Sequence, residues 1–294
     1  MSGKRWIDET LHGGIRFAFE ADRILYESDT EHQHLVLFEN SRFGRVLMLD
    51  GATQVTTRDE FVYHEMMAHV PILAHGRARR ILVIGGGDGG IAREALKHAS
   101  VERLVEVEID RAVVDFSLEH LPEVSGGAYE DPRLDLVIAD GMDYVAGAGD
   151  AFDVIIVDST DPQGPGAVLF SERFYRAAQA RLAEGGVIVT QNGVPFLQPD
   201  ELVSTMTCFG RLFADAGCYL AVIPTYIGGF MAMGWGTDDA NLRAVPLEML
   251  EARFRAARLE TLYYTPAVHK AAFALPRFIA DRVEAGLAAA RRGG

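Results

Sequence analysis

Short segments of alternating apolar and polar residues run through the first part of the chain. The alternation is clear at residues 15–19, 34–38 and 45–49. Turn-forming Ser, Asp, Asn and Gly residues separate these segments, as expected for strands that reverse direction. The pattern predicts a small antiparallel β unit, which we take as an N-terminal domain over residues 1–57.

The pattern then changes to a helical spacing. Between residues 59 and 74, apolar side chains recur every three or four positions, which predicts a helix. This helix would connect the β unit to a larger domain over residues 58–294.

From residue 79 onward, apolar runs and helical patterns alternate along the chain. Strand, helix and strand in succession imply a parallel sheet with crossover helices on its faces. We therefore predict the α/β class, with a Rossmann-like doubly wound sheet. The predicted strands cover residues 81–84, 103–110, 134–141, 152–158, 186–191, 220–223 and 230–234, the predicted helices cover 91–97, 112–120, 170–183 and 202–216, and residues 288–294 are predicted to fray.

The first strand of this larger domain leads into a glycine-rich turn. Residues 81–84 are all β-formers and three of them are branched, as in a strand buried on both faces. Gly85, Gly87 and Gly90 then fit G-x-G-x-x-G, the nucleotide-binding turn of a doubly wound sheet. This pattern does not separate dehydrogenases, flavoproteins and methyltransferases, because all three fit it.

Asp88, in the middle of the turn, narrows this choice. A helix N-terminus with bare amides suits a phosphate group, and a carboxylate in the same place would repel one. Asp88 therefore favours a ligand that is cationic at this point over a pyrophosphate. The alternative is that Asp88 only caps the following helix.

Three further acids, Glu108, Asp140 and Asp158, stand at or just past the carboxyl ends of predicted strands. In open α/β sheets, ligands bind at that edge. Glu108 follows Gly90 by 18 residues, where an acid is expected to bind ribose hydroxyls, and Asp140 would accept from an adenine amino group. Each acid alone could equally be a helix cap or a solvated loop residue. Together with Asp88, the three favour a site for a positively charged nucleoside.

The loop after the fourth strand carries a pair of aspartates. Asp158 and Asp161 stand three residues apart, in a loop that Pro162 and Pro165 stiffen. One carboxylate can accept a proton while the other holds a second cationic group. The alternative is that both aspartates cap the turn.

Composition and charge fit a cationic small-molecule ligand. The net charge of −14 at pH 7 disfavours nucleic acid as a partner, although acidity also serves solubility alone. Cys208 and Cys218 lack the spacing of a disulfide framework or a metal site, and the histidines form no H-E-x-x-H motif, so we expect no metal. Residues 1–9 contain no apolar signal core, and no apolar run reaches the roughly 18 residues of a membrane span. We therefore expect a cytoplasmic protein without a membrane partner.

Ten short segments, spread over nearly the whole chain, resemble one enzyme family. The combination of the G-G-G-D-G turn with the D-S-T-D-P-x-G-P loop is highly specific. The matching segments are residues 30–34 (TEHQH), 43–46 (FGRV), 49–51 (LDG), 58–65 (RDEFVYHE), 85–89 (GGGDG), 107–110 (VEID), 158–165 (DSTDPQGP), 191–193 (QNG), 223–226 (IPTY) and 271–276 (AAFALP). On these segments the chain resembles the spermidine synthases, which are polyamine aminopropyltransferases, in their bacterial branch. One difference is Thr57, which stands where the family often has glutamate.

The resemblance implies a methyltransferase-like Rossmann domain behind a β-stranded N-terminal domain, assembled as a homodimer or homotetramer. It implies that the chain transfers an aminopropyl group from a co-substrate, decarboxylated S-adenosylmethionine, to putrescine. The products would be spermidine, 5′-methylthioadenosine and a proton. By the same resemblance, Gln33, Glu108, Asp140, Gly141 and Pro165 would bind the nucleoside, Asp88 would bind the aminopropyl ammonium, Asp158 would accept the proton, and His64, Asp161, Tyr63, Gln54 and Tyr226 would contact the polyamine.

Three other functions are weighed against this one. An S-adenosylmethionine methyltransferase would share the fold, but it needs room for the donor carboxylate, which Asp88 would repel. The same aspartate argues against an NAD-dependent dehydrogenase. A polyamine-sensing relative without activity should have lost Asp158 or Asp161, and both are present. The acceptor amine stays open, because Tyr226, Ile227 and Trp235 could line a cleft or belong to the core.

Overall fold

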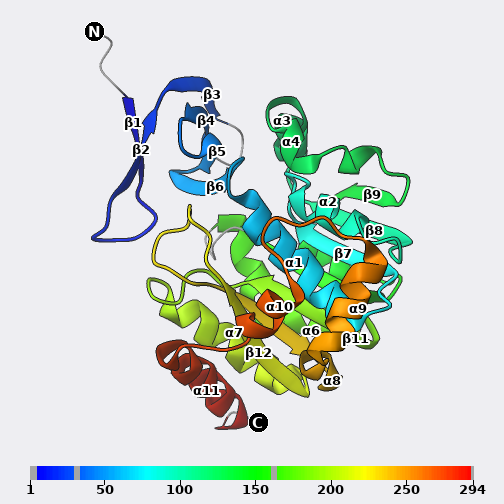
Figure 1. The fold of residues 1–294 in the computed structure, drawn as a ribbon. Helices are drawn as coiled ribbons and strands as arrows, with labels where there is room; N and C mark the ends of the chain where they lie inside the picture. Colours follow the sequence, from blue (N-terminus) through cyan, green and yellow to red (C-terminus); the bar gives the residue numbers. More distant parts are fainter. Residues whose placement is uncertain (1–4, 30–33, 160–163, 293–294) are drawn as a thin grey trace.

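The computed structural model describes residues 5–29, 34–159 and 164–292 of the 294-residue chain (Figure 1). Two small antiparallel sheets come first, and a seven-stranded sheet flanked by helices follows. Within these described ranges, no helix is long and apolar enough to cross a membrane.

The antiparallel β unit expected at the start of the chain is present as two sheets. β1 (Arg5–Glu9) and β2 (Phe17–Ala21) form a hairpin that projects away from the large sheet (Figure 1). The second sheet is a meander whose strands pair in chain order. The Phe19 ring lies 5.8 Å from the Phe38 ring and so joins the two sheets. The strands of the meander are β3 (Arg23–Asp29), β4 (His34–Asn40), β5 (Gly44–Leu49) and β6 (Ala52–Thr56).

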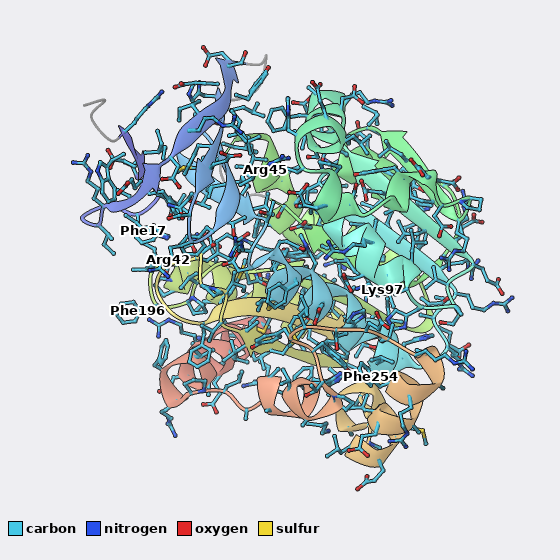
Figure 2. The ribbon with its side chains drawn as sticks, turned by 45° about the horizontal axis from the view of Figure 1, so that its top comes forward. Phe17, Arg42, Arg45, Lys97, Phe196 and Phe254 are labelled. Carbon is cyan, nitrogen blue, oxygen red and sulfur yellow. The ribbon has the colours of Figure 1, made fainter. Side chains whose placement is uncertain are left out.

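Side chains of the meander contact a helix of the larger domain. Arg45 on β5, labelled in Figure 2, donates a hydrogen bond to the carbonyl oxygen of His120 at the end of α3 (Arg111–His120). The ring of Tyr26 on β3 packs edge-on against Phe116 of the same helix, with 4.9 Å between ring centres. The N-terminal sheets are therefore fixed beside the first half of the large sheet.

The large sheet has the strand order β12-β13-β11-β10-β7-β8-β9. The strands from β11 to β9 are parallel to one another, and β13 runs antiparallel to both β11 and β12. This parallel core with crossover helices confirms the predicted Rossmann-like α/β class. The strands are β7 (Arg80–Gly85), β8 (Arg103–Glu108), β9 (Leu134–Ile138), β10 (Phe152–Asp158), β11 (Leu182–Gln191), β12 (Asp215–Ala221) and β13 (Met231–Thr237).

Helices cover both faces of the large sheet (Figure 1). Along β7, Ile81 and Val83 belong to the core that includes the helices over residues 60–75 and 90–96. Leu82 and Ile84 belong to the core that includes the helices over residues 141–146, 172–180 and 199–212. The strand is therefore buried on both faces, as its sequence predicts. The remaining helices are α1 (Glu60–His75), α2 (Gly90–Leu96), α4 (Pro122–Ser125), α5 (Gly141–Ala146), α6 (Glu172–Ala180), α7 (Pro199–Leu212), α8 (Asn241–Ala244), α9 (Leu247–Ala257), α10 (Pro266–Ala272) and α11 (Arg277–Arg292), with 3₁₀ turns η1 (Ala128–Glu130) and η2 (Gly164–Phe170).

The helix predicted over residues 202–216 is shorter at its end than expected. α7 stops at Leu212, because Phe213 adopts an extended backbone, and β12 begins at Asp215. The prediction was wrong here because a helix and the edge strand that follows it form one continuous stretch of mixed apolar and polar residues, with no Gly or Pro between them.

The prediction that residues 288–294 fray is also wrong for residues 288–292. α11 continues to Arg292 and packs along α7. The two helices approach closely at Gly286, where a Cβ atom would lie 2.6 Å from Cβ of Met206. The small size of this residue lets the apolar face of α11 find a partner, which gives the helix its stability.

Candidate functional site

The carboxyl ends of three parallel strands meet at one point of the sheet. β7 ends at Gly85 and β10 at Asp158, and these two residues are partners in the register of the sheet. The neighbouring strand β8 ends at Glu108. Tyr63 and His64 of α1 reach the same place. The structure therefore brings together residues that are up to 95 positions apart in the sequence.

Glycines allow the turn after β7 to come close to these acids. Gly85 has a φ angle of +81°, and a Cβ atom there would lie 1.9 Å from the carbonyl oxygen of Asp158. At Gly87, a Cβ atom would lie 3.0 Å from Oε2 of Glu108. Only residues without a side chain permit both approaches. The glycine pattern thus sets the spacing between the turn and the two neighbouring strand ends.

Asp88 contacts both the start of α2, as the capping alternative predicts, and a cationic side chain. Its Oδ1 accepts a hydrogen bond of 2.8 Å from the amide of Gly90, the first residue of α2. Its Oδ2 lies 3.5 Å from Nε2 of His64. Burial raises the pKa of Asp88, but the charge and hydrogen bonding of His64, the amide of Gly90 and the charge of Arg93 together outweigh this effect and hold the pKa below its ordinary value. Asp88 therefore contacts the start of the helix and also faces a cationic group.

His64 is buried between two carboxylates. Its Nδ1 lies 2.5 Å from Oε2 of Glu60, one turn earlier in α1. Nδ1 donates to the Glu60 carboxylate, and Nε2 faces the second carboxylate, that of Asp88, so the surroundings favour the imidazolium, in which both ring nitrogens carry a proton. Burial alone would lower the pKa of His64, but Asp88 and Glu60 together raise it to about 10. The acidic site thus contains a cation of its own.

Asp158 is paired with a tyrosine. The hydroxyl of Tyr63 donates a hydrogen bond of 2.6 Å to Oδ1 of Asp158. Burial, followed by the charge of Asp88, raises the pKa of Asp158 to about 6, although the hydrogen bond from Tyr63 acts in the opposite direction. Asp158 is therefore a stronger base than an ordinary carboxylate, and its orientation is fixed.

The residues predicted to bind a nucleoside lie at the ends of β8 and β9. Glu108 is buried beside Gly87, accepts from the amide of Asp110, and has its pKa raised by burial. Asp140 is the N-cap of α5 and accepts from the amides of the second and third residues of that helix. The helix-cap alternative thus describes what Asp140 does in this structure. Gly141 packs against β7, where a Cβ atom would lie 2.5 Å from Ile84.

Gln54 and Tyr226 contact each other, and Tyr226 stands beside Tyr63. The hydroxyl of Tyr226 donates to the carbonyl oxygen of Gln54 at 2.5 Å, and its ring stands perpendicular to the Tyr63 ring, with 6.3 Å between ring centres. Trp235 is fully buried in the core. The structure therefore decides the question left open by the sequence for Trp235, which is a core residue, whereas Tyr226 is close to Tyr63.

The side chains of three predicted site residues lie outside the described part of the structure. Gln33 and Asp161 lie outside the described residues. Pro165 belongs to η2, but its side chain is likewise outside the description. Their roles stay predictions. In the described part of the chain, no group of three His, Cys, Asp or Glu residues is arranged to hold a metal ion.

Two residues of the site were missed in the sequence. Glu60 contacts His64, and Arg93 of α2 donates hydrogen bonds of 2.9 and 3.0 Å to Glu60. Glu60 stands four residues before His64 in a predicted helix, a spacing that places both on one face, so this pair could have been found. Arg93 could not, because no local pattern indicates that α2 packs on α1.

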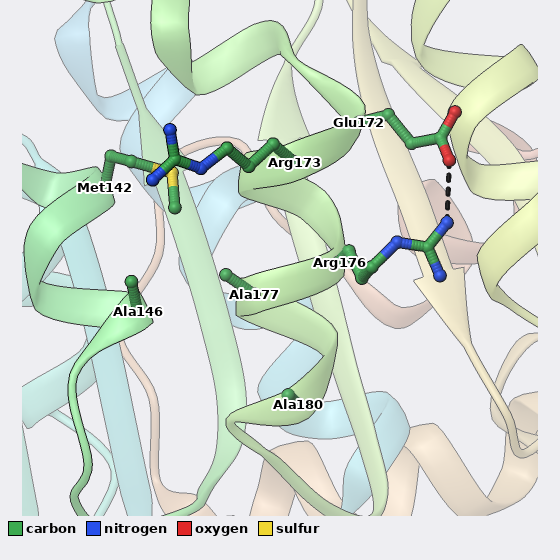
Figure 3. A pocket seen from close by; sticks show the side chains of 7 residues that line it. All are labelled: Met142, Ala146, Glu172, Arg173, Arg176, Ala177 and Ala180. Carbon is green, nitrogen blue, oxygen red and sulfur yellow. Dashed lines mark hydrogen bonds and ion pairs between the residues drawn. The ribbon is translucent and has the colours of Figure 1, made fainter.

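A separate pocket of about 610 Å³ opens between α5 and α6 (Figure 3). None of the predicted site residues lines it. Two of its charged groups are paired, since Arg176 donates a hydrogen bond of 2.7 Å to Glu172. We therefore place the candidate site at the acidic strand ends and not here. The pocket is lined by Met142, Ala146, Glu172, Arg173, Arg176, Ala177 and Ala180.

Two family models match the chain and together span most of it. The model described as "Spermidine synthase tetramerisation domain" matches residues 5–57, and the model described as "Spermine/spermidine synthase domain" matches residues 60–245. The chain belongs to the spermidine synthase family. The resemblance inferred from ten short segments is thereby confirmed.

Individual relatives agree with this spermidine synthase assignment. A protein of Ruegeria sp. (strain TM1040) named "Polyamine aminopropyltransferase" is 59% identical over 95% of this chain and 98% of its own length. "Polyamine aminopropyltransferase 1" of Pseudomonas aeruginosa is 56% identical over 94% of this chain and 96% of its own.

Solved structures agree as well. A spermidine synthase in complex with the transition-state analogue AdoDATO has a TM-score of 0.90 at 36% identity, covering 95% of both chains. The spermidine synthase from Thermotoga maritima has a TM-score of 0.87 at 34% identity, covering 95% of this chain and 94% of that one.

Proposed function

We propose that this chain is a polyamine aminopropyltransferase that transfers the aminopropyl group of decarboxylated S-adenosylmethionine to putrescine. The products are spermidine, 5′-methylthioadenosine and a proton. Family membership and relatives that share more than half of its residues support this activity. The observation that carries it within the structure is the pairing of Tyr63 with Asp158 next to Asp88, at the point where three strands end.

The donor would bind along the ends of β7, β8 and β9. Glu108 accepts from the ribose hydroxyls, and Asp140, Gly141, Gln33 and Pro165 contact the rest of the nucleoside. Asp88 pairs with the ammonium of the aminopropyl arm and would repel the carboxylate that ordinary S-adenosylmethionine carries. An unpaired, buried carboxylate costs several kcal/mol, which is enough to select the decarboxylated donor.

The reaction would be a direct displacement. The amine nitrogen forms a bond to the methylene carbon next to sulfur, the C–S bond breaks, and its electron pair stays on sulfur as a neutral thioether. An alkylamine has a pKa of roughly 10 and arrives protonated. Asp158 holds this ammonium and accepts its proton, directly or by way of Tyr63 or water, and its pKa of about 6 improves it as a base. No metal is needed, because a sulfonium already carries a good leaving group.

The acceptor would lie on the side of Asp158 that faces away from the donor. His64, Asp161, Tyr63, Gln54 and Tyr226 are the residues that we assign to it. The contact of Tyr226 with Gln54 supports a cleft that ends near these two residues. Putrescine is the acceptor that the family favours, and cadaverine, agmatine and spermidine differ from it in length or in the far end group.

Assembly and location follow the family. We infer a homodimer or homotetramer, because the matched N-terminal model is described as a tetramerisation domain. We also infer a division at residues 57 and 58 between that domain and the catalytic one, a cytoplasmic enzyme, and no nucleic acid or membrane as partner.

One assay tests the proposed function. Purified protein is incubated with either decarboxylated or ordinary S-adenosylmethionine and a panel of amines, and the products are identified by mass spectrometry. Spermidine and 5′-methylthioadenosine should form only from the decarboxylated donor with putrescine. A methylated amine from the ordinary donor would make the protein a methyltransferase instead, and no product from either donor would leave only a binding function.

A further inference from the structure

A further buried carboxyl group lies on β8 near the acids of the site, and the proposed reaction does not use it. Glu106 stands on β8 two residues before Glu108, so both side chains leave the same face of the strand. Glu106 is 0% exposed, and its Oε2 has no hydrogen-bond partner among the residues that the structure describes. An ionised carboxylate in such surroundings would carry a large desolvation cost.

Tyr129, in η1, connects Glu106 to the glycine turn. Its hydroxyl oxygen lies 2.5 Å from Oε1 of Glu106 and 3.1 Å from the carbonyl oxygen of Gly87. The phenol has one proton, so it can donate to only one of two acceptors. If Glu106 is protonated, it donates to Tyr129 and Tyr129 donates to Gly87, and both contacts are then hydrogen bonds. The geometry therefore favours the neutral acid.

The charges around Glu106 favour the same state. Burial raises the pKa of Glu106 well above its ordinary value, and the nearby carboxylates of Asp88, Glu108 and Asp158 raise it further. A hydrogen bond donated by Tyr129 to the ionised form would act in the opposite direction. A neutral Glu106 adds no negative charge to a place that already holds three acids.

Tyr129 also supports the turn by packing. A Cβ atom at Gly89 would lie 2.8 Å from Cε2 of Tyr129, so the ring rests directly against that glycine. The tyrosine thus contacts the turn on both sides of Asp88, by a hydrogen bond to the residue before it and by van der Waals contact with the residue after it.

We propose that Glu106 is a positioning residue that stays a neutral carboxylic acid and, through Tyr129, fixes the orientation of the turn that carries Asp88. The inference rests on the proposed function, because it assigns the turn to the aminopropyl donor. Glu106 would touch neither substrate, and its effect on the reaction would pass through the Gly87 carbonyl.

Replacements that separate charge from hydrogen bonding test this proposal. Glu106→Gln keeps a neutral donor of the same shape, so the KM for the donor should stay within about twofold of the wild type. Glu106→Ala and Tyr129→Phe remove the connection to Gly87, and each should raise the donor KM about three- to tenfold, as expected for the loss of one hydrogen bond. The KM for putrescine should change less than twofold. Tyr175→Phe, which removes a buried hydroxyl on α6 that contacts Thr205 of α7, is the matched control and should leave both KM values unchanged.

Two outcomes would overturn the proposal. If Glu106→Gln is as impaired as Glu106→Ala, the negative charge matters and Glu106 is not a neutral donor. If Tyr129→Phe raises both KM values equally, the tyrosine supports the fold in general and not the donor turn.

An infrared difference spectrum, wild type minus Glu106→Gln at neutral pH, gives a readout without turnover. It should contain the carbonyl band of a protonated acid, and its absence would also overturn the proposal. Because this band does not depend on activity, a failure of the proposed function, seen as no turnover by the wild type, is distinguishable from a failure of the inference.

Discussion

At the scale of single residues, burial and nearby charges set the protonation states of His64 and Asp158. The pKa of His64 is raised to about 10 by the carboxylates on both sides of its ring, so it is a cation at neutral pH. The pKa of Asp158 is raised to about 6, chiefly by burial, so it loses its proton only above that pH in the free enzyme. An arriving ammonium would lower the pKa of Asp158 again, because an opposite charge favours the ionised form. Substrate binding thus keeps Asp158 in the ionised form that pairs with the ammonium.

The first prediction concerns Asp158 itself. Asp158→Asn should lower kcat by about 10²- to 10⁴-fold, the range typical for loss of a general base. The fold should be retained, because the amide oxygen can still accept the hydrogen bond from Tyr63. Product formation followed by mass spectrometry measures the first effect, and thermal unfolding measures the second. Turnover close to that of the wild type would remove Asp158 from the role of base.

The second prediction concerns the partner of that base. The hydrogen bond from Tyr63 lowers the pKa of Asp158, so Tyr63→Phe should raise it. The ascending limb of kcat/KM against pH, which reports the free enzyme, should therefore move to higher pH in the variant. Tyr175→Phe serves as control and should leave the limb near pH 6. A limb that stays in place in Tyr63→Phe would mean that another group titrates there.

At the scale of elements, the start of α2 joins the glycine turn to α1. Gly90 is the first residue of α2, and a Cβ atom there would lie 2.2 Å from Cε1 of His64. Helix propensity alone favours alanine over glycine in a helix. The contact with His64 opposes this preference for alanine, because a methyl group would push the imidazolium away from Asp88.

Gly90→Ala decides between these two effects. We expect the variant to lose about 1–3 kcal/mol of stability, the usual cost of overpacking, and to bind the donor more weakly. Thermal unfolding and the donor KM measure these changes. Gly147→Ala, where the new methyl group would make only ordinary contacts of 3.5 Å, is the matched control. A more stable Gly90→Ala variant with unchanged KM would contradict the close packing of α2 on His64.

The elements also explain how much of the fold and site could be predicted. The buried strand β7 and its glycine turn were predicted, because their signals are local and strong. The end of α7 was not, because no Gly or Pro separates this helix from β12. The continuation of α11 was not, because it depends on how Gly286 packs against Met206, on a different helix. In the site, the acids at strand ends followed from the topology of a parallel sheet. Arg93 and Tyr129 did not, since only the tertiary packing brings them to Glu60 and Glu106.

At the scale of the whole molecule, the imidazolium of His64 couples folding to pH. Its pKa is about 10 in the folded chain and about 6.5 in an unfolded one. Because the folded value is the higher, this group contributes its full stabilisation below pH 6.5, and the contribution disappears as the pH rises through 10. The fold should therefore be more sensitive to alkali than a chain without this group.

Urea unfolding of the wild type and of His64→Gln, measured from pH 6.5 to pH 10, tests this coupling. The free energy of unfolding of the wild type should fall more steeply over this range than that of the variant. The difference between the two curves isolates His64 from the other groups that titrate there. Parallel curves would mean that His64 is not held as a cation.

The last prediction concerns assembly, and it starts from the hairpin of β1 and β2. Trp6 on β1 is 55% exposed, although it is a large apolar side chain, and it lies within the segment matched by the tetramerisation model. Burying such a side chain between copies would stabilise an oligomer by about 1.5–3 kcal/mol per tryptophan. Light scattering should therefore give a dimer or tetramer for the wild type and a smaller species for Trp6→Asp. Phe196, labelled in Figure 2, is 67% exposed outside that segment, and Phe196→Asp should leave the mass unchanged. If Phe196→Asp dissociates the oligomer and Trp6→Asp does not, the copies meet through another face.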